Sequence, residues 1–103
     1  MDTKNAKILL VEDDAKVCAF INKGLTEEGF EVSIALNGKE GYQMASANKF
    51  DLLILDIMLP EMNGLEICKA VREENTHVPI LFLTALGSSE NIAMGLSSGA
   101  DDY

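Results

Sequence analysis

Positive charge is scarce in this chain. Eight Lys and Arg stand against seventeen Asp and Glu among its 103 residues, so the formal net charge is −9 at pH 7, and Arg72 is the only arginine. Neutralising the phosphates of a nucleic acid requires clustered basic side chains, whereas the lysines here are scattered singly. The charge balance therefore argues against direct DNA binding by this chain.

Long apolar runs are also absent, and cysteines are few. No run approaches the roughly 20 apolar residues of a membrane span, and residues 1–6 lack the apolar segment of a signal peptide. Cys18 and Cys68 lie far apart, each within a helical pattern among apolar neighbours, so they indicate neither a disulfide scaffold nor a metal motif. We therefore expect a cytoplasmic domain with buried, reduced thiols and no membrane insertion.

What is present is an alternation of two hydrophobic patterns. Residues 8–11, 52–55 and 78–83 form apolar runs, and residues 30–34 alternate with period two as a half-buried edge strand does. Each strand-like run precedes a segment with helical spacing. These helical segments cover residues 17–25, 39–48, 65–71 and 92–96.

This alternation predicts an α/β fold. Strands that are apolar throughout are buried on both faces, which indicates a parallel sheet with helices on both sides, a doubly wound arrangement. A chain of about 100 residues buries one core, so we expect a single domain over residues 1–103. The sequence stops after Tyr103, where the alternation would call for another strand.

Acidic side chains follow the predicted strands at the points where the strands end. Glu12 and Asp13 follow the first strand, Asp56 follows the third, and Thr84 follows the fourth. The carboxyl ends of parallel strands meet at one edge of a sheet, and open α/β sheets bind their ligands at that edge. We therefore expect a pocket of three carboxylates with a hydroxyl beside them.

A bound cation would offset the repulsion among these carboxylates. Three carboxylates at close range repel one another, which raises their pKa values and opposes folding unless a positive ion joins them. Oxygen ligands with no His or Cys nearby select a hard ion, Mg²⁺ in particular. The alternative interpretation is that the acids are merely solvated, which would suit any one of them better than all three together.

Two absences narrow the chemistry of this pocket. The first strand–helix turn has no phosphate loop of the G-x-G-x-x-G or G-K-S/T type, which disfavours nucleotide or flavin binding. A phosphatase with a second Asp two residues after its nucleophile is disfavoured as well, because Met58 holds that place. Mg²⁺-assisted phosphoryl transfer onto a carboxylate of the protein itself remains.

Four segments together resemble a known family. They are I-L-L-V-E-D-D from residue 8, D-L-L-I-L-D-I-M-L-P-E-M-N-G from residue 51, P-I-L-F-L-T-A from residue 79 and G-A-D-D-Y from residue 99. In this order they are similar to the receiver domain of bacterial two-component response regulators, over residues 8–103. The resemblance implies a flavodoxin-like (βα)5 receiver fold with strand order 2-1-3-4-5, its final strand and helix absent from this C-terminally incomplete chain.

The resemblance also implies roles for the acidic residues. Asp56 would accept the phosphoryl group. Asp13 would ligate Mg²⁺ directly and Glu12 would do so through water, while Asp56 and the backbone carbonyl of Met58 would complete the protein's share of the metal site.

Three further residues take roles in switching by the same resemblance. Thr84 would move its hydroxyl toward the new phosphoryl group, and Tyr103 would turn inward into the space that Thr84 leaves. Ala85 is small and would leave the phosphoryl site accessible. The Lys that ends strand 5 in the family has no counterpart here, so phosphorylation would be slow and its coupling to the switch weak.

A receiver of this family takes its phosphoryl group from a sensor histidine kinase and changes conformation to control an output. The G-A-D-D-Y ending is typical of the class with a winged-helix domain after the receiver, so the expected output is transcription. DNA would be bound only by an output domain outside this chain, and a homodimer is expected. The receiver would catalyse its own phosphorylation and dephosphorylation and would not be an enzyme on other substrates.

Two other functions stay open. One is a receiver-like module for dimerisation or interaction that no longer switches, with surfaces left uncovered by the absent strand and helix. The other is a metal-dependent hydrolase of external substrates, which the sequence supports less because the pocket offers no general base besides the metal-binding acids.

Overall fold

A computed structural model describes residues 6–74 and 77–83 of the chain. Strands and helices alternate along these residues, as the hydrophobic patterns predict. The elements are β1 (Lys7–Val11), α1 (Ala15–Glu27), β2 (Glu31–Ala35), α2 (Gly38–Ala47), β3 (Leu52–Asp56), α3 (Gly64–Glu74) and β4 (Ile80–Leu83).

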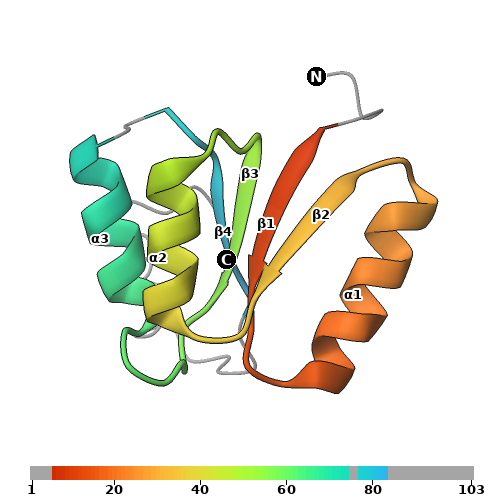
Figure 1. The fold of residues 1–103 in the computed structure, drawn as a ribbon, viewed down its shortest axis with the longest axis horizontal. Coiled ribbons are helices and arrows are strands. Elements are labelled where there is room, and N and C mark those ends of the chain that lie inside the picture. Colours follow the sequence, from red (N-terminus) through yellow and green to blue (C-terminus); the bar gives the residue numbers. More distant parts are fainter. Residues whose placement is uncertain (1–5, 75–76, 84–103) are drawn as a thin grey trace.

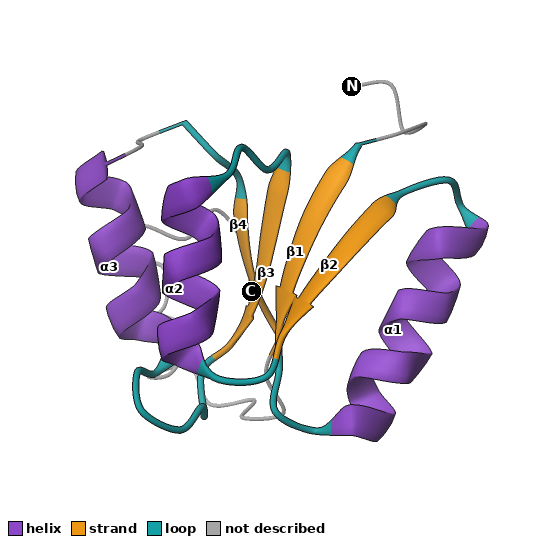
Figure 2. Ribbon diagram, in the orientation of Figure 1, coloured by secondary structure: helices purple, strands orange, loops and turns teal. Residues whose placement is uncertain are grey.

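The four strands form one parallel sheet in the order β2-β1-β3-β4. Helix α1 lies on one side of the sheet, and α2 and α3 lie side by side on the other (Figures 1 and 2). The predicted doubly wound α/β fold is confirmed, including the half-buried edge strand β2. The order 2-1-3-4 also agrees with the family topology over the strands described.

Alternate residues of the central strands face the two helical layers. On β1, Leu9 and Val11 belong to a core cluster shared with α2 and α3. Ile8 and Leu10 belong to a second cluster, which includes Cys18 of α1. Because both faces are covered, only Lys7 at the start of β1 is exposed and residues 8–11 are buried, which explains the continuous apolar run at 8–11.

Helix α1 has defined signals at both ends. Asp14 caps its first turn, with Oδ1 accepting hydrogen bonds from the backbone N–H groups of Lys16 at 2.9 Å and Val17 at 3.3 Å. At the other end Gly29 has φ 96°, and the N–H of Phe30 donates to the Leu25 carbonyl, as in a Schellman motif. Asp14, the third acid in the run Glu12–Asp13–Asp14, is therefore a helix-capping residue.

The strand boundaries differ from the sequence prediction by one or two residues, and the starts of β4 and β2 differ for identifiable reasons. Residues 78 and 79 precede β4, because Pro79 has no N–H to donate to the ladder, although its carbonyl accepts from Leu53 at 3.0 Å. Strand β2 begins at Glu31, one residue late, because the Phe30 N–H is used in ending α1.

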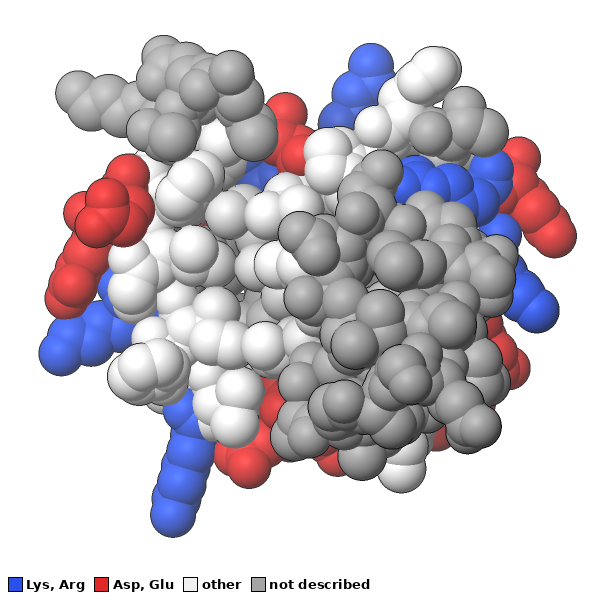
Figure 3. All heavy atoms as spheres, turned by 180° about the vertical axis from the view of Figure 1, so that it is seen from behind, with Lys and Arg blue, Asp and Glu red and all other residues white. Residues whose placement is uncertain are grey.

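Some predicted features lie outside the described residues. They are the fourth helix at 92–96 and the residues Thr84, Ala85 and Tyr103. Within the described part, no helix has the length and apolar character needed to cross a membrane. On the face seen in Figure 3, the Lys and Arg side chains that are visible lie mainly near the outline of the molecule.

Candidate functional site

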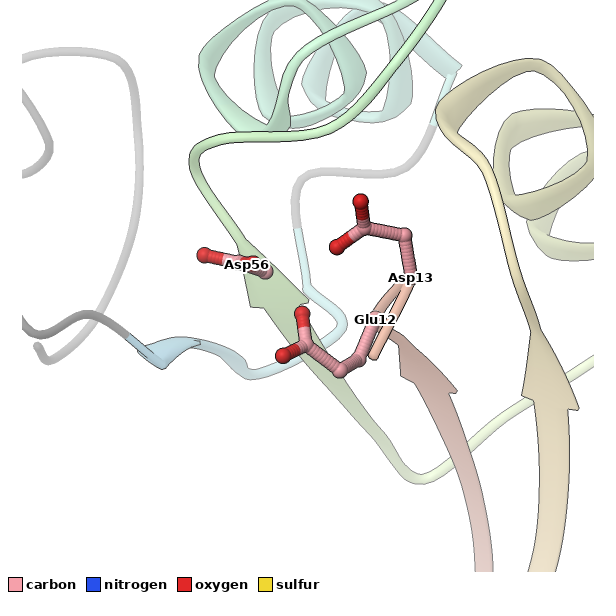
Figure 4. Close-up of side chains that lie close together, drawn as sticks. All are labelled: Glu12, Asp13 and Asp56. Carbon is pink, nitrogen blue, oxygen red and sulfur yellow. The ribbon is translucent and has the colours of Figure 1, made fainter. Parts of the chain in front are cut away.

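Three carboxylates converge at the carboxyl edge of the sheet. Glu12 and Asp13 project from the end of β1, and Asp56 projects from the end of β3 (Figure 4). One carboxylate oxygen from each residue lies within 4.8 Å of the others. The structure therefore brings together the three acids that the strand ends indicated.

Strand register explains this convergence. In the parallel pair of β1 and β3, Val11 lies opposite Leu55, which places the next residues, Glu12 and Asp56, side by side. The N–H of Glu12 donates to the Ala35 carbonyl at the end of β2 at 3.1 Å, so the backbone stays in the sheet up to the first acid.

The loop after Asp56 folds back over the strand end. The N–H of Met58 donates to Oδ1 of Asp56 at 3.3 Å. The N–H of Gly64 donates to the Ile57 carbonyl at 3.0 Å, and a Cβ at Gly64 would collide with the carbonyl of Asp56. Glycine is required at position 64 because α3 begins directly against the backbone of Asp56, a stronger demand than that of a plain turn.

The same loop contacts the start of α2. The N–H of Gly38 donates to the Pro60 carbonyl at 3.3 Å, and a Cβ on Gly38 would collide with the carbonyl of Met62. Asn37 caps α2, with its side-chain oxygen accepting from the N–H of Glu40 at 2.8 Å. The close contact at Gly38 was not predicted, because Asn-Gly in the sequence signals only a turn.

Glu12 is the acid of the cluster whose ionised form is most disfavoured by its surroundings. Its side chain is 6% exposed, and its Oε2 has no hydrogen-bond partner among the residues that the structure describes. Burial is the main cause that raises the pKa of Glu12 to about 8, followed by its hydrogen bond with Asp56 and the negative charges of Asp56 and Asp13. Without a cation, the cluster would hold a proton at neutral pH.

The donor set fits a hard divalent cation. All three residues offer carboxylate oxygens, and a buried oxygen of Glu12 has no hydrogen-bond partner within residues 6–74 and 77–83. A positive ion would satisfy that oxygen and remove the repulsion that raises the pKa of Glu12. Oxygen donors of this kind suit Mg²⁺ better than softer metals.

Cys18 is a neighbour of the site that the sequence reasoning treated only as core. Its Sγ donates to the backbone carbonyl of Glu12 at 3.2 Å. Burial raises the pKa of the Cys18 thiol, and the nearby charges of Glu12, Asp14 and Asp13 raise it further. Its position in a helical apolar pattern gave no signal of this contact, which depends on how α1 packs against the end of β1.

Other predicted site residues are only partly placed by the structure. The side chain of Met58 is 68% exposed and points out of the core, so any share in a metal site belongs to its backbone. Thr84, Ala85 and Tyr103 lie outside the described residues. His77, predicted as an ordinary loop residue, is exposed and precedes β4, at the edge of the sheet opposite the acids.

Comparison with known proteins identifies relatives. A family model described as the response regulator receiver domain matches residues 8–103. The transcriptional regulatory protein CusR of Escherichia coli K12 is 52% identical over 97 residues, which cover 94% of this chain and 43% of CusR. SilR of Salmonella typhimurium, named as a probable transcriptional regulatory protein, is also 52% identical, over 94% of this chain and 42% of its own length.

A solved structure shows the same fold. The receiver domain of Francisella response regulator 1452 superposes with a TM-score of 0.91 at 37% identity, covering 96% of this chain and 82% of that one. The chain spans less than half the length of the curated relatives that it matches, and most of the length of the solved receiver domain.

Proposed function

Because this chain belongs to the response regulator receiver domain family, we propose that it is a phosphoacceptor domain with Asp56 as its acceptor. The proposed domain extends over residues 1–103, of which residues 8–103 match the family model. The observation that carries the proposal is the cluster of Glu12, Asp13 and Asp56 at the carboxyl edge of the sheet, in which a buried Glu12 oxygen has no partner in the described part of the chain.

Glu12, Asp13 and Asp56 would hold Mg²⁺, and the backbone carbonyl of Met58 would complete the set. When bound, Mg²⁺ offsets negative charge on the phosphoryl oxygens and on the attacking carboxylate. The protein's own contribution is to keep three carboxylates together in a partly buried site. Their mutual repulsion there favours binding of a cation.

The transfer itself belongs to Asp56. An oxygen of the Asp56 carboxylate attacks phosphorus as the P–N bond of a phosphohistidine breaks, so an aspartyl phosphate forms and the imidazole leaves with a proton from solvent. The Met58 N–H bound to Oδ1 orients the carboxylate and leaves Oδ2 as the nucleophile. Thr84 and Tyr103 would then respond to the phosphoryl group, and Ala85 would leave room for it.

The partners follow from the same chemistry. The donor would be the phosphohistidine of a sensor histidine kinase, and the output would be transcription, as the names of CusR and SilR state for those proteins. DNA would be bound by an output domain outside this chain, and the receiver would act as a homodimer. We place it in the cytoplasm, because Cys18 and Cys68 are buried in two different core clusters on opposite faces of the sheet, which does not indicate a disulfide scaffold.

The receiver would catalyse only its own phosphorylation and dephosphorylation and would not act on external substrates. The family match favours this signalling function over the non-switching interaction module and over the hydrolase.

Labelling with a small acyl-phosphate donor tests the proposal. We expect the chain to incorporate phosphate in the presence of Mg²⁺, and we expect chelation or Asp56→Asn to abolish incorporation. Asp51→Asn is the matched control, because exposed Asp51 lies at the start of β3, where its Oδ2 accepts from the backbone N–H of Lys7 at 2.7 Å. Labelling that persists in Asp56→Asn, or that Asp51→Asn abolishes equally, would overturn the proposal.

A further inference from the structure

Cys18 places a thiol beneath the acidic cluster. It lies in α1 with its side chain toward the sheet, is 4% exposed, and belongs to the core cluster of Ile8, Leu10 and Ile54. Its Sγ is 3.2 Å from the backbone carbonyl oxygen of Glu12, the acceptor of its hydrogen bond. Packing is therefore not its only contact, because the thiol reaches the backbone of a proposed metal ligand.

The accepting carbonyl has a particular place in the site. It belongs to the planar peptide group that joins Glu12 to Asp13, so its orientation is shared by both residues. On the other side of Glu12, the N–H donates to the Ala35 carbonyl at 3.1 Å. Glu12 is thus held by a strand bond at its nitrogen and by a helix side chain at its carbonyl.

We propose that Cys18 is a positioning residue for the cation site, whose thiol fixes the Glu12–Asp13 peptide so that both carboxylates face Asp56. This inference rests on the proposed function, because the cation is the Mg²⁺ that supports phosphorylation of Asp56. Residues behind the direct ligands hold those ligands in place and thereby affect metal affinity.

Cys68 provides an internal comparison. It is as deeply buried as Cys18, at 0% exposed, but it lies in α3 and packs in the core cluster on the opposite face of the sheet. A role for Cys18 in packing alone would make the two cysteines equivalent toward the cation. A positioning role would make only Cys18 matter.

Calorimetric titration with Mg²⁺ in the absence of a phosphodonor tests the proposal on wild type, Cys18→Ala, Cys18→Ser and Cys68→Ala. Loss of one hydrogen bond predicts Mg²⁺ binding weaker by roughly 3- to 10-fold in Cys18→Ala. Cys18→Ser keeps a donor and should bind within about twofold of wild type, as should Cys68→Ala. Hydrogen exchange at the Asp13 amide, measured without cation, should be faster in Cys18→Ala than in Cys18→Ser.

The outcomes separate this inference from the proposed function. If wild type binds Mg²⁺ and Cys18→Ala binds it equally well, or if Cys18→Ser is as weak as Cys18→Ala, the positioning role is wrong and the phosphoacceptor proposal stands. An equal loss in Cys68→Ala would also overturn the positioning role, because the effect would then be one of general core packing. No Mg²⁺ binding by wild type would overturn both.

Discussion

Glu12 carries the clearest residue-scale signature of the site. Its side chain is 6% exposed, contacts Asp56 and lies close to Asp13, and one of its oxygens has no hydrogen-bond partner among the described residues. A buried acid in such surroundings favours its protonated form in the folded state. Without a cation, the stability of the domain should therefore depend on pH through this one group.

We predict that the metal-free domain loses stability as the pH rises from 5 to 8. The folded pKa of Glu12 is about 8 against an ordinary 4.5, so between these values the folded chain binds more protons than the unfolded chain. Stability then falls with rising pH, by about 2–4 kcal/mol across the window. Urea unfolding in the presence of chelator at several pH values measures this.

Glu12→Gln is the control for that experiment, because Gln has no proton to lose. Its unfolding free energy should stay nearly flat over the same window and should exceed that of wild type at pH 8. A wild-type stability that is constant or rises from pH 5 to pH 8 would show that Glu12 is already ionised in the metal-free fold.

At the residue scale, the sequence predicted which acids converge but not the contacts and burial that surround them. The positions of Glu12, Asp13 and Asp56 follow from where apolar runs end, because parallel strands share one carboxyl edge. The contact between the Cys18 thiol and the Glu12 carbonyl depends on the distance of α1 from β1, which no local pattern encodes. The burial of Glu12 likewise arises from tertiary packing.

At the scale of elements, the loop after β3 is held between two helices. The backbone N–H of Gly64 at the start of α3 donates to the Ile57 carbonyl, and the backbone N–H of Gly38 at the start of α2 donates to the Pro60 carbonyl. Within the loop, Glu61 adopts φ 69°, which is uncommon for a residue with a side chain. The loop that follows Asp56 is therefore constrained from both ends.

Gly38→Ala is expected to destabilise the domain by about 1–3 kcal/mol, because the new Cβ would push into the Met62 carbonyl and displace this loop. Gly24→Ala is the matched control in α1, where no atom lies within 4 Å of the added Cβ. It should stabilise the domain by about 0.5–1 kcal/mol through helix propensity. Thermal unfolding of both variants checks the contrast, and equal effects would contradict the close contact at Gly38.

Element prediction from the sequence succeeded where the pattern was continuous. The runs at 8–11 and 52–55 are strands because covering helices bury both of their faces. It was less accurate at the boundaries. Strand β4 starts after Pro79, which has no N–H to donate to the ladder, and β2 starts after Phe30, whose N–H donates to the Leu25 carbonyl at the end of α1. It missed the close approach at Gly38, because glycine is needed there to avoid the carbonyl of Met62, which is distant in the sequence.

At the scale of the whole molecule, a chain of net charge −9 will respond to any cation through screening. A specific site adds a separate effect, because a ligand that binds only the folded state stabilises it by mass action. We predict that Mg²⁺ at about 100 times its dissociation constant adds about 2.7 kcal/mol to the unfolding free energy. NaCl at matched ionic strength should add much less.

Asp56→Asn distinguishes these two effects. In the absence of Mg²⁺ this variant should be more stable than wild type, since one of three mutually repelling carboxylates becomes neutral. It should then gain little from Mg²⁺, while its response to NaCl should be unchanged. Equal stabilisation of wild type and Asp56→Asn by Mg²⁺ would mean that the ion acts by screening alone.

The overall architecture was the most predictable property of the molecule. Fully apolar strands separated by helical segments permit a parallel sheet with helices on both faces and few other arrangements, and the structure has this sheet in the order β2-β1-β3-β4. Thr84, Ala85 and Tyr103 remain predictions from the family resemblance, since they lie outside the described residues.

The central claim is that Asp56 receives the phosphoryl group, and chemical trapping tests it most directly. After reaction with an acyl-phosphate donor and Mg²⁺, borohydride reduces an aspartyl phosphate to homoserine, which peptide mass spectrometry locates. The proposal predicts homoserine at position 56 and nowhere else, with none formed when Mg²⁺ is chelated. Homoserine at position 13 or 51, 5-hydroxynorvaline at position 12 (the product from a glutamyl phosphate), or labelled protein with an unmodified position 56 would contradict it.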